Sequence, residues 1–129
     1  MGYLLDTHVW LWLDSDPKRI PENLLEIFRN PSTHLYLSSI SCWEIVIKTS
    51  QDKLKLNTSP EELFRDLQTD YLGQLLDFSR DHAVHCGRLP PIHKDPFDRA
   101  LLAQAQVEQL QLVTADTQLA LYGSDIIVL

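Results

Sequence analysis

Short apolar runs alternate along the chain with longer segments in which apolar residues recur at helical spacing. The first run, Tyr3-Leu4-Leu5, has no polar alternation, which is typical of a strand buried on both faces of a parallel sheet. The predicted strands are residues 3–5, 34–40, 74–78, 110–114 and 126–129. The predicted helices are residues 7–13, 21–29, 42–54, 59–69, 79–89 and 95–109. This alternation predicts βαβ units with a parallel sheet in a three-layer α/β arrangement.

We find no internal repeat, linker or change of composition that would divide the chain. Its 129 residues are enough to bury a hydrophobic core without disulfides or metals as staples. We therefore expect a single domain over residues 1–129.

Four acidic residues lie where predicted strands end or where the following helices begin. They are Asp6, Glu44, Asp98 and Asp116. In a right-handed parallel sheet, the carboxyl ends of strands and the starts of the following helices share one edge. We therefore expect these four carboxylates to converge although they are far apart in the sequence.

Helix capping explains some of these acids equally well. Asp6 could cap the helix that starts at Thr7, and Asp95 stands in the N-cap position before a proline. Glu44 has the spacing of a capping box with Ser41, and it could also form an ion pair with Lys48 one turn later in the helix. Taken singly, capping is the simpler explanation for Glu44 and Asp95.

Asp98 is different because it shares a helical stripe with Leu101 and Leu102 and so faces the interior. Arg99 follows it directly but faces another side of the helix. Crowded carboxylates repel each other unless a cation joins them. Hard oxygen ligands suit Mg²⁺ or Mn²⁺, and such sites usually serve phosphoryl chemistry. The sequence thus predicts a metal-dependent phosphodiesterase or phosphatase, and it predicts that neutralising Glu44 or Asp98 stabilises the metal-free protein.

Four sequence blocks resemble the PIN-domain ribonucleases, in particular the VapC-like toxins of bacterial type II toxin–antitoxin pairs. The blocks are L-L-D-T-H (4–8), S-I-S-C-W-E-I (39–45), H-K-D-P-F-D-R (93–99) and L-V-T-A-D (112–116), and together they cover nearly the whole chain. The resemblance implies a five-stranded parallel sheet in the order 3-2-1-4-5, Mg²⁺-dependent endoribonuclease activity and a protein antitoxin. It assigns the metal ligands to Asp6, Glu44, Asp98 and Asp116, with Asp95 as a further ligand or a residue that supports one. The fourth acid is the most variable in the family.

The resemblance also implies a homodimer, for which we expect Leu63, Phe64 and Leu67 to be interface residues. The identity of the RNA and of the antitoxin stays open.

Several other side chains flank the acidic blocks and could contact RNA phosphates or orient a ligand. They are Lys48, Lys94, Arg99 and Thr114. Solvated surface charges, or a satisfied hydroxyl at a strand end, account for them as well. Trp10, Trp12 and Trp43 could stack on bases, but their apolar surroundings predict core positions first.

The formal net charge of −7 argues against a protein that holds nucleic acid through its net charge. RNA contacts must therefore come from local cations, and any contact with DNA from a basic antitoxin. Cys42 and Cys86 form no C-x-x-C motif, no export signal opens the chain, and no apolar run approaches the about 18 residues of a membrane span. We expect a cytoplasmic protein.

The sequence also bears on other functions and on a second metal site. A phosphatase of the haloacid dehalogenase type needs a second aspartate two residues after Asp6, where this chain has His8. The short chain disfavours a flap nuclease, and a metal site at His82, His85 and Cys86 lacks a fourth ligand. A catalytically inactive PIN-like module that binds RNA or protein is the main alternative.

Overall fold

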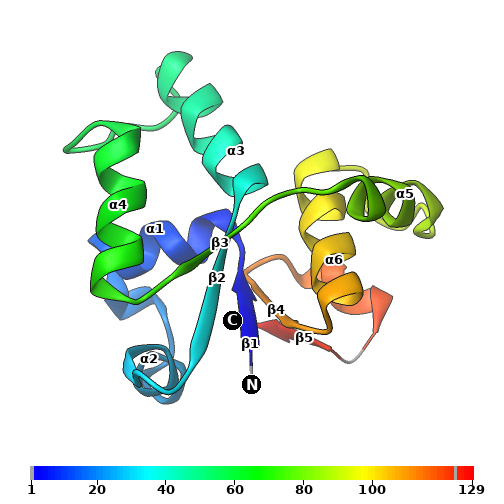
Figure 1. The fold of residues 1–129 in the computed structure, drawn as a ribbon, viewed down its shortest axis with the longest axis horizontal. Helices are drawn as coiled ribbons and strands as arrows, with labels where there is room; N and C mark the ends of the chain where they lie inside the picture. Colours follow the sequence, from blue (N-terminus) through cyan, green and yellow to red (C-terminus); the bar gives the residue numbers. More distant parts are fainter. Residues whose placement is uncertain (1, 124) are drawn as a thin grey trace.

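A five-stranded sheet lies at the centre of the computed structural model, which describes residues 2–123 and 125–129 (Figure 1). Its strands are β1 (Gly2–Leu5), β2 (His34–Ser38), β3 (Gln74–Leu76), β4 (Gln111–Thr114) and β5 (Ile126–Val128). The strand order is β3-β2-β1-β4-β5 and every neighbouring pair is parallel. Both the predicted order and the predicted direction are confirmed.

Helices cover both faces of this sheet. They are α1 (Thr7–Ser15), α2 (Glu22–Arg29), α3 (Ser39–Ser50), α4 (Pro60–Asp70), α5 (Arg80–Arg88) and α6 (Pro96–Glu108), with short 3₁₀ helices η1 (Pro17–Arg19) and η2 (Thr117–Tyr122). In β1, Leu5 packs with α1, α2 and α4, while the preceding Leu4 packs with α6 on the opposite face. Alternating side chains of one strand therefore reach two separate cores, which confirms the three-layer arrangement. No helix in the described residues combines the length and the apolar character that crossing a membrane requires.

The start of α3 differs from the prediction. The helix begins at Ser39, directly after β2, and the Ser38 hydroxyl caps it by accepting a hydrogen bond from the amide of Ile40 (3.0 Å). The predicted start at Cys42 and the predicted capping box of Ser41 and Glu44 are therefore wrong. Ser41 instead lies in the first turn of the helix and Glu44 in the second, both on its buried side.

Two expectations about apolar residues are also wrong. Trp43 is 58% exposed on α3 rather than part of the core. Leu63 and Leu67 are only 2% and 1% exposed on α4, so they belong to the core and cannot form a dimer interface. The reason is that α4 is amphipathic and turns its leucines onto the core formed with α1 and α2.

Candidate metal centre

A cleft of about 300 Å³ opens at the carboxyl ends of β1 and β4. These two strands are neighbours, but β1 is followed by a connection toward β2 on one side, whereas β4 is followed by one toward β5 on the other. Open α/β sheets bind ligands at such a point, where the connections diverge. The cleft is lined by Asp6, His8, Trp12, Glu44, Lys48, Asp95, Asp98, Ala115 and Asp116. All four predicted carboxylates, and Asp95 with them, therefore reach the same cleft.

Asp6 caps α1 and also lines the cleft. Its Oδ1 accepts a hydrogen bond from the amide of Val9 (3.0 Å) and so caps α1. Its Oδ2 accepts a hydrogen bond from Thr114 Oγ1 (2.6 Å). The residue is 4% exposed, and burial raises the pKa of its carboxyl group. Capping and a place at the cleft are compatible because each role uses a different carboxylate oxygen.

Glu44 reaches the cleft from the second turn of α3 and is compensated locally. Its Oε2 lies 2.8 Å from Lys48 Nζ, which confirms the ion pair that the i,i+4 spacing suggested. Its Oε1 accepts a hydrogen bond from Thr7 Oγ1 (2.7 Å), and this hydroxyl also lies 2.9 Å from Ser41 Oγ. Both carboxylate oxygens of this buried side chain thus have partners from the protein itself.

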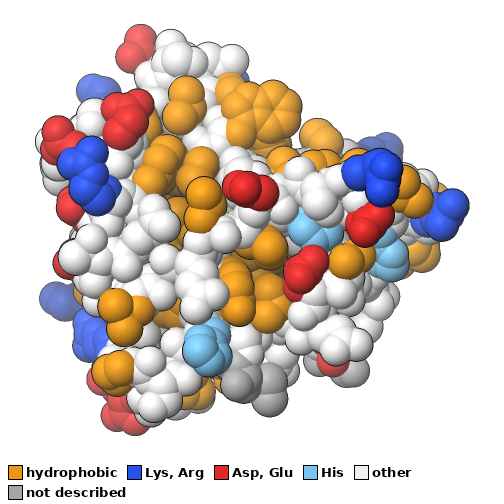
Figure 2. Space-filling model, viewed as in Figure 1, with side chains coloured by type: hydrophobic (Ala, Val, Ile, Leu, Met, Phe, Trp, Pro, Cys, Tyr) orange, Lys and Arg blue, Asp and Glu red, His pale blue; other side chains and the backbone are white. Residues whose placement is uncertain are grey.

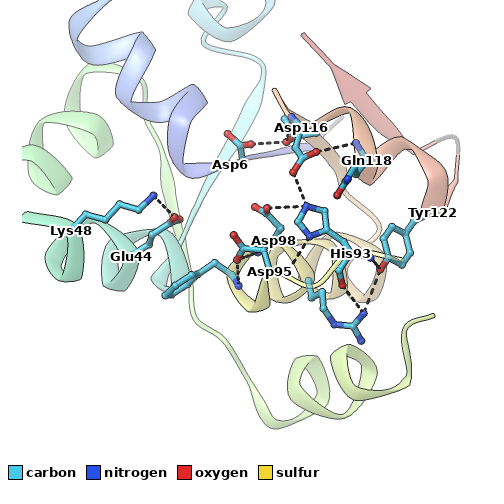
Figure 3. A network of polar contacts seen from close by, with 12 residues as sticks. Asp6, Glu44, Lys48, His93, Asp95, Asp98, Asp116, Gln118 and Tyr122 are labelled. Carbon is cyan, nitrogen blue, oxygen red and sulfur yellow. Dashed lines mark hydrogen bonds and ion pairs between the residues drawn. The ribbon is translucent and has the colours of Figure 1, made fainter. Parts of the chain in front are cut away.

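Asp98 lies in the first turn of α6, three residues after the N-cap residue Asp95 (Figure 3). Asp95 Oδ1 accepts hydrogen bonds from the amides of Phe97 (2.9 Å) and Asp98 (3.4 Å), which confirms the predicted cap. No lysine or arginine pairs with Asp98 in the described part of the chain. Burial, together with the charges of Asp95, Asp6 and Asp116, raises the pKa of Asp98 from its ordinary 3.8 to about 7.

Asp116 follows β4 and caps η2, with Oδ1 accepting a hydrogen bond from the amide of Gln118 (2.9 Å). Its Oδ2 lies 2.6 Å from Nε2 of His93. This hydrogen bond lowers the pKa of Asp116 below its usual value. The pKa values of the two neighbouring carboxyl groups are therefore shifted in opposite directions: that of Asp98 is raised and that of Asp116 is lowered.

His93 is the residue that the sequence analysis missed. It is 8% exposed, and its Nε2 lies 3.3 Å from Asp98 Oδ2 as well as 2.6 Å from Asp116 Oδ2. His93, Asp98 and Asp116 can each present one ligand atom, and these three atoms lie within 4.8 Å of one another. The block H-K-D-P-F-D-R contains His93, but the residue precedes the helix, so no periodicity indicated which way its ring faces.

Two predicted RNA contacts acquire other roles. Thr114 is fully buried, donates a hydrogen bond to Asp6 and accepts one from the amide of Asp116 (3.0 Å), so it positions the acids and cannot touch RNA. Arg99 does not line the cleft, and its guanidinium donates to the carbonyl oxygens of residues 86, 89, 90 and 93. Lys48 lines the cleft. Lys94 is exposed and does not line the cleft, although it precedes Asp95 in the sequence.

The other candidate residues are the histidines and the cysteine of α5 and two of the tryptophans. His82 Nδ1 accepts a hydrogen bond from the amide of Ser79 and Nε2 pairs with Glu108 (2.8 Å), while His85 Nε2 lies 2.6 Å from Gln106 Oε1. Around Cys86, no group of metal ligands forms within the described residues. Trp10 is buried as predicted. Trp12 lines the cleft, and the guanidinium of Arg19 lies 4.5 Å from its ring centre.

Comparison with known proteins identifies the family and the fold. Residues 3–124 match the family model of the PIN domain. Among solved structures, VapBC2 from Rickettsia felis bound to a promoter DNA fragment contains a chain with a TM-score of 0.73 and 18% identity, and the alignment covers 100% of this chain and 98% of that one. A toxin–antitoxin complex from Klebsiella pneumoniae gives a TM-score of 0.70 and 21% identity, covering 98% of this chain and 96% of that one.

A DNA-bound VapBC from Salmonella typhimurium gives a TM-score of 0.70 and 20% identity, covering 100% of this chain and 97% of that one. The comparison with curated protein sequences found no significant match. At these identities the solved structures establish a shared fold over the full length of the chain.

Proposed function

Because this chain belongs to the PIN domain family, we propose that it is a metal-dependent endoribonuclease and the toxin of a type II toxin–antitoxin pair. The observation that carries the proposal is the convergence of Asp6, Glu44, Asp98 and Asp116 on one cleft at the diverging connections of the sheet. These four acids come from four separate elements, so helix capping alone does not explain why they meet.

The donor set of the cleft fits a hard divalent cation. All four acids offer carboxylate oxygens, which Mg²⁺ and Mn²⁺ prefer. No lysine or arginine pairs with Asp98 in the described residues, and burial together with the neighbouring acids raises its pKa to about 7, which leaves room for a cation on this side of the cleft. When bound, such a cation activates a water molecule and offsets negative charge on the leaving oxygen of a phosphodiester.

The residues of the chain prepare this site in distinct ways. The bonds from Val9 and Thr114 fix the carboxylate of Asp6 in one orientation. Lys48 lies at the mouth of the cleft with its side chain 35% exposed, so it can hold an RNA phosphate while it remains close to Glu44. Asp95 holds the start of α6 and thereby the position of Asp98.

Local cations beside the cleft support binding of a nucleic acid strand, as RNA cleavage requires, in spite of the net charge of −7. A second, more open groove of about 630 Å³ runs along η1 and the start of α2, and Lys18, Arg19 and Arg29 line it. Arg19 stacks on Trp12, which itself lines the acidic cleft, so the basic groove and the cleft are neighbours. An RNA strand that enters the cleft can place its flanking phosphates in this groove.

The partners follow from the same proposal. The three solved structures described above are a toxin–antitoxin complex and two VapBC structures, the latter two bound to DNA. We therefore assign to this chain a protein antitoxin, contact with DNA only through that antitoxin, a homodimer and a cytoplasmic location. Figure 2 shows apolar side chains exposed over α3, and the exposed residues of this helix include Trp43 (58%) and Val46 (43%). They give an apolar surface suited to a protein partner.

The alternative is a PIN-like module that binds RNA or protein without cleavage. The pairing of Glu44 with Lys48 and Thr7 favours it, because this acid already has its partners without a cation. A module of this kind has no need of the uncompensated charge at Asp98, which is why we prefer the nuclease.

Cleavage of labelled RNA in Mg²⁺, in Mn²⁺ and in chelator tests the proposal. We expect cleavage only with a divalent cation, and we expect Asp6→Asn to lower the rate by at least about 100-fold, since it removes several kcal/mol of charge stabilisation. Asparagine still caps a helix well, so the fold should persist. The matched control is Asp81→Asn, an exposed aspartate in the first turn of α5.

Two results would contradict a metal-dependent nuclease. Cleavage that survives the chelator or the Asp6→Asn change excludes the metal mechanism. Tight RNA binding without cleavage in any divalent cation establishes the inactive module instead.

A further inference from the structure

Several hydrogen bonds hold the segment between α5 and α6 in place around His93. Arg99 Nη1 donates to the carbonyl oxygens of Pro90 (3.0 Å) and His93 (3.3 Å). The amide of His93 donates to Tyr122 Oη (2.8 Å), and this hydroxyl donates to the carbonyl of Pro90 (2.8 Å). These bonds involve only the backbone of His93. They explain why its ring is held beside Asp98 and Asp116, and they persist when the side chain is changed.

The hydrogen bonds of the ring fix where its proton lies. The amide of Asp95 donates to His93 Nδ1 (3.0 Å), so Nδ1 is an acceptor and carries no hydrogen. The proton is then on Nε2, which faces Asp116 Oδ2 at 2.6 Å and Asp98 Oδ2 at 3.3 Å. In this one tautomer His93 donates its hydrogen to Asp116 Oδ2, while Asp98 Oδ2 lies 3.3 Å from the same nitrogen.

From this geometry we propose that His93 is a positioning residue of the metal centre, holding Asp98 and Asp116 toward a shared cation without binding the cation itself. The inference rests on the proposed function, because it takes this cleft to be a divalent cation site. It separates His93 from the two aspartates, although all three offer ligand atoms within 4.8 Å of one another.

A direct ligand role requires a different hydrogen-bond pattern. Nε2 can bind a cation only after it loses its hydrogen, and a neutral ring would then carry the hydrogen on Nδ1. That hydrogen would point at the amide hydrogen of Asp95, which lies at the N-cap of α6 and has its direction set by the backbone. The cap of α6 thus selects the tautomer that donates to the acids.

The carboxylates remain available to a cation in this arrangement. Asp116 receives one hydrogen bond at each oxygen, from Gln118 and from His93, which leaves a lone pair free on both. Asp98 has His93 as its only polar side-chain partner among the described residues. Partners that orient metal ligands in this way typically change metal affinity about 10- to 100-fold when they are removed.

Two substitutions separate the two ends of the ring. In His93→Asn, an amide oxygen at the δ position can still accept from Asp95, but no donor reaches the acids. In His93→Gln, an amide nitrogen at the ε position can still donate to Asp98 and Asp116, while the bond from Asp95 is lost. His85→Asn and His85→Gln are matched controls. The ring of His85 pairs with Gln106, and neither residue lines the cleft.

Binding of Mg²⁺, measured by titration calorimetry, is the first readout. We expect His93→Asn to weaken Mg²⁺ binding about 10- to 100-fold, and His93→Gln to weaken it by less than about 10-fold. The His85 variants should bind as the wild type does. Unchanged affinity in His93→Asn, or an equal loss in both His93 variants, overturns the proposal.

The second readout needs no variant and no RNA. Long-range ¹⁵N–¹H correlation spectra of the wild type should show the imidazole proton of His93 on Nε2, both without metal and in saturating Mg²⁺. A proton on Nδ1 in the Mg²⁺-bound protein identifies His93 as a ligand and overturns the proposal. Mg²⁺ binding without RNA cleavage would refute the nuclease and leave the role of His93 intact. RNA cleavage with unchanged Mg²⁺ affinity in His93→Asn would support the nuclease and refute the role of His93.

Discussion

The two sides of the cleft treat their acids differently. On the side formed by α3, Glu44 is compensated by Lys48 of its own helix and by Thr7. On the side formed by α6, Asp98 has no cationic partner from lysine or arginine in the described residues, and its pKa rises to about 7. Both acids belong to one cleft and both are mostly buried. Two acids of one cleft therefore differ in their immediate partners: Glu44 has a lysine beside it and Asp98 has not.

This difference indicates where a cation has most to contribute. A cation at the α3 side would compete with Lys48 for Glu44, whereas at the α6 side it would meet carboxylates that repel each other. Metal-free protein is thus expected to hold a proton at Asp98 near neutral pH, and a bound cation to replace that proton.

The largest expected effect is that of Asp98→Asn in chelator. A rise of the pKa from 3.8 to about 7 corresponds to up to about 4 kcal/mol. Asp98 keeps its proton in the folded chain but loses it in the unfolded chain, so its contribution to stability is lost as pH rises from about 4 to about 7. Asp98→Asn should therefore be more stable than the wild type at pH 8, with the gain shrinking toward pH 4. Urea unfolding at several pH values measures this difference.

Asp81→Asn serves as the control in the same experiment, since Asp81 is exposed in the first turn of α5. Our assignment of the charge on the α6 side fails if the gain from Asp98→Asn is independent of pH.

A smaller effect is expected when Lys48 is replaced by methionine, which makes the α3 side resemble the α6 side. Glu44 is then buried without its cation, and we expect a loss of about 1–3 kcal/mol in chelator. Added Mg²⁺ should recover more stability in this variant than in the wild type, because the cation gains a second uncompensated acid. Thermal melts with and without Mg²⁺ test this.

The exposed Lys53→Met is the control for that change. Equal responses of the two lysine variants to Mg²⁺ would show that Lys48 does not compensate the acid.

The smallest effect is expected for Glu44→Gln. The sequence alone predicted that neutralising Glu44 stabilises the metal-free protein, as for Asp98. The structure reverses this expectation, because the change removes a paired charge and leaves Lys48 free to turn to solvent. We expect a loss of about 1 kcal/mol or less, compared with Glu62→Gln on the exposed face of α4. A clear stabilisation by Glu44→Gln in chelator would place repulsion on the α3 side as well.

Much of the fold and part of the site follow from local patterns. The apolar run before Asp6 predicted a buried central strand, and the Asp95-Pro96 pair predicted the start of α6. The stripe that Asp98 shares with Leu101 predicted that this acid faces inward. Each of these inferences depends on residues within one or two helical turns, for which spacing along the chain fixes direction.

The start of α3 was mispredicted because several serines offer the same local chemistry. Ser38, Ser39 and Ser41 can all cap a helix, and the sequence does not rank them. In the fold, β2 runs straight into α3, so Ser38 becomes the cap and Ser41 is turned toward Thr7. Only the position of α1 beside α3 makes that choice.

What the sequence determined by itself is the alternation of strands and helices and the placement of acids at their junctions, because both follow from periodicity and from the geometry of parallel sheets. The tertiary structure decided which acids carry an uncompensated charge. Thr7 and Glu44 are 37 residues apart, and His93 and Asp116 are 23 residues apart. Contacts over such distances depend on how separate elements pack, and no local pattern encodes the direction in which the ring of His93 points.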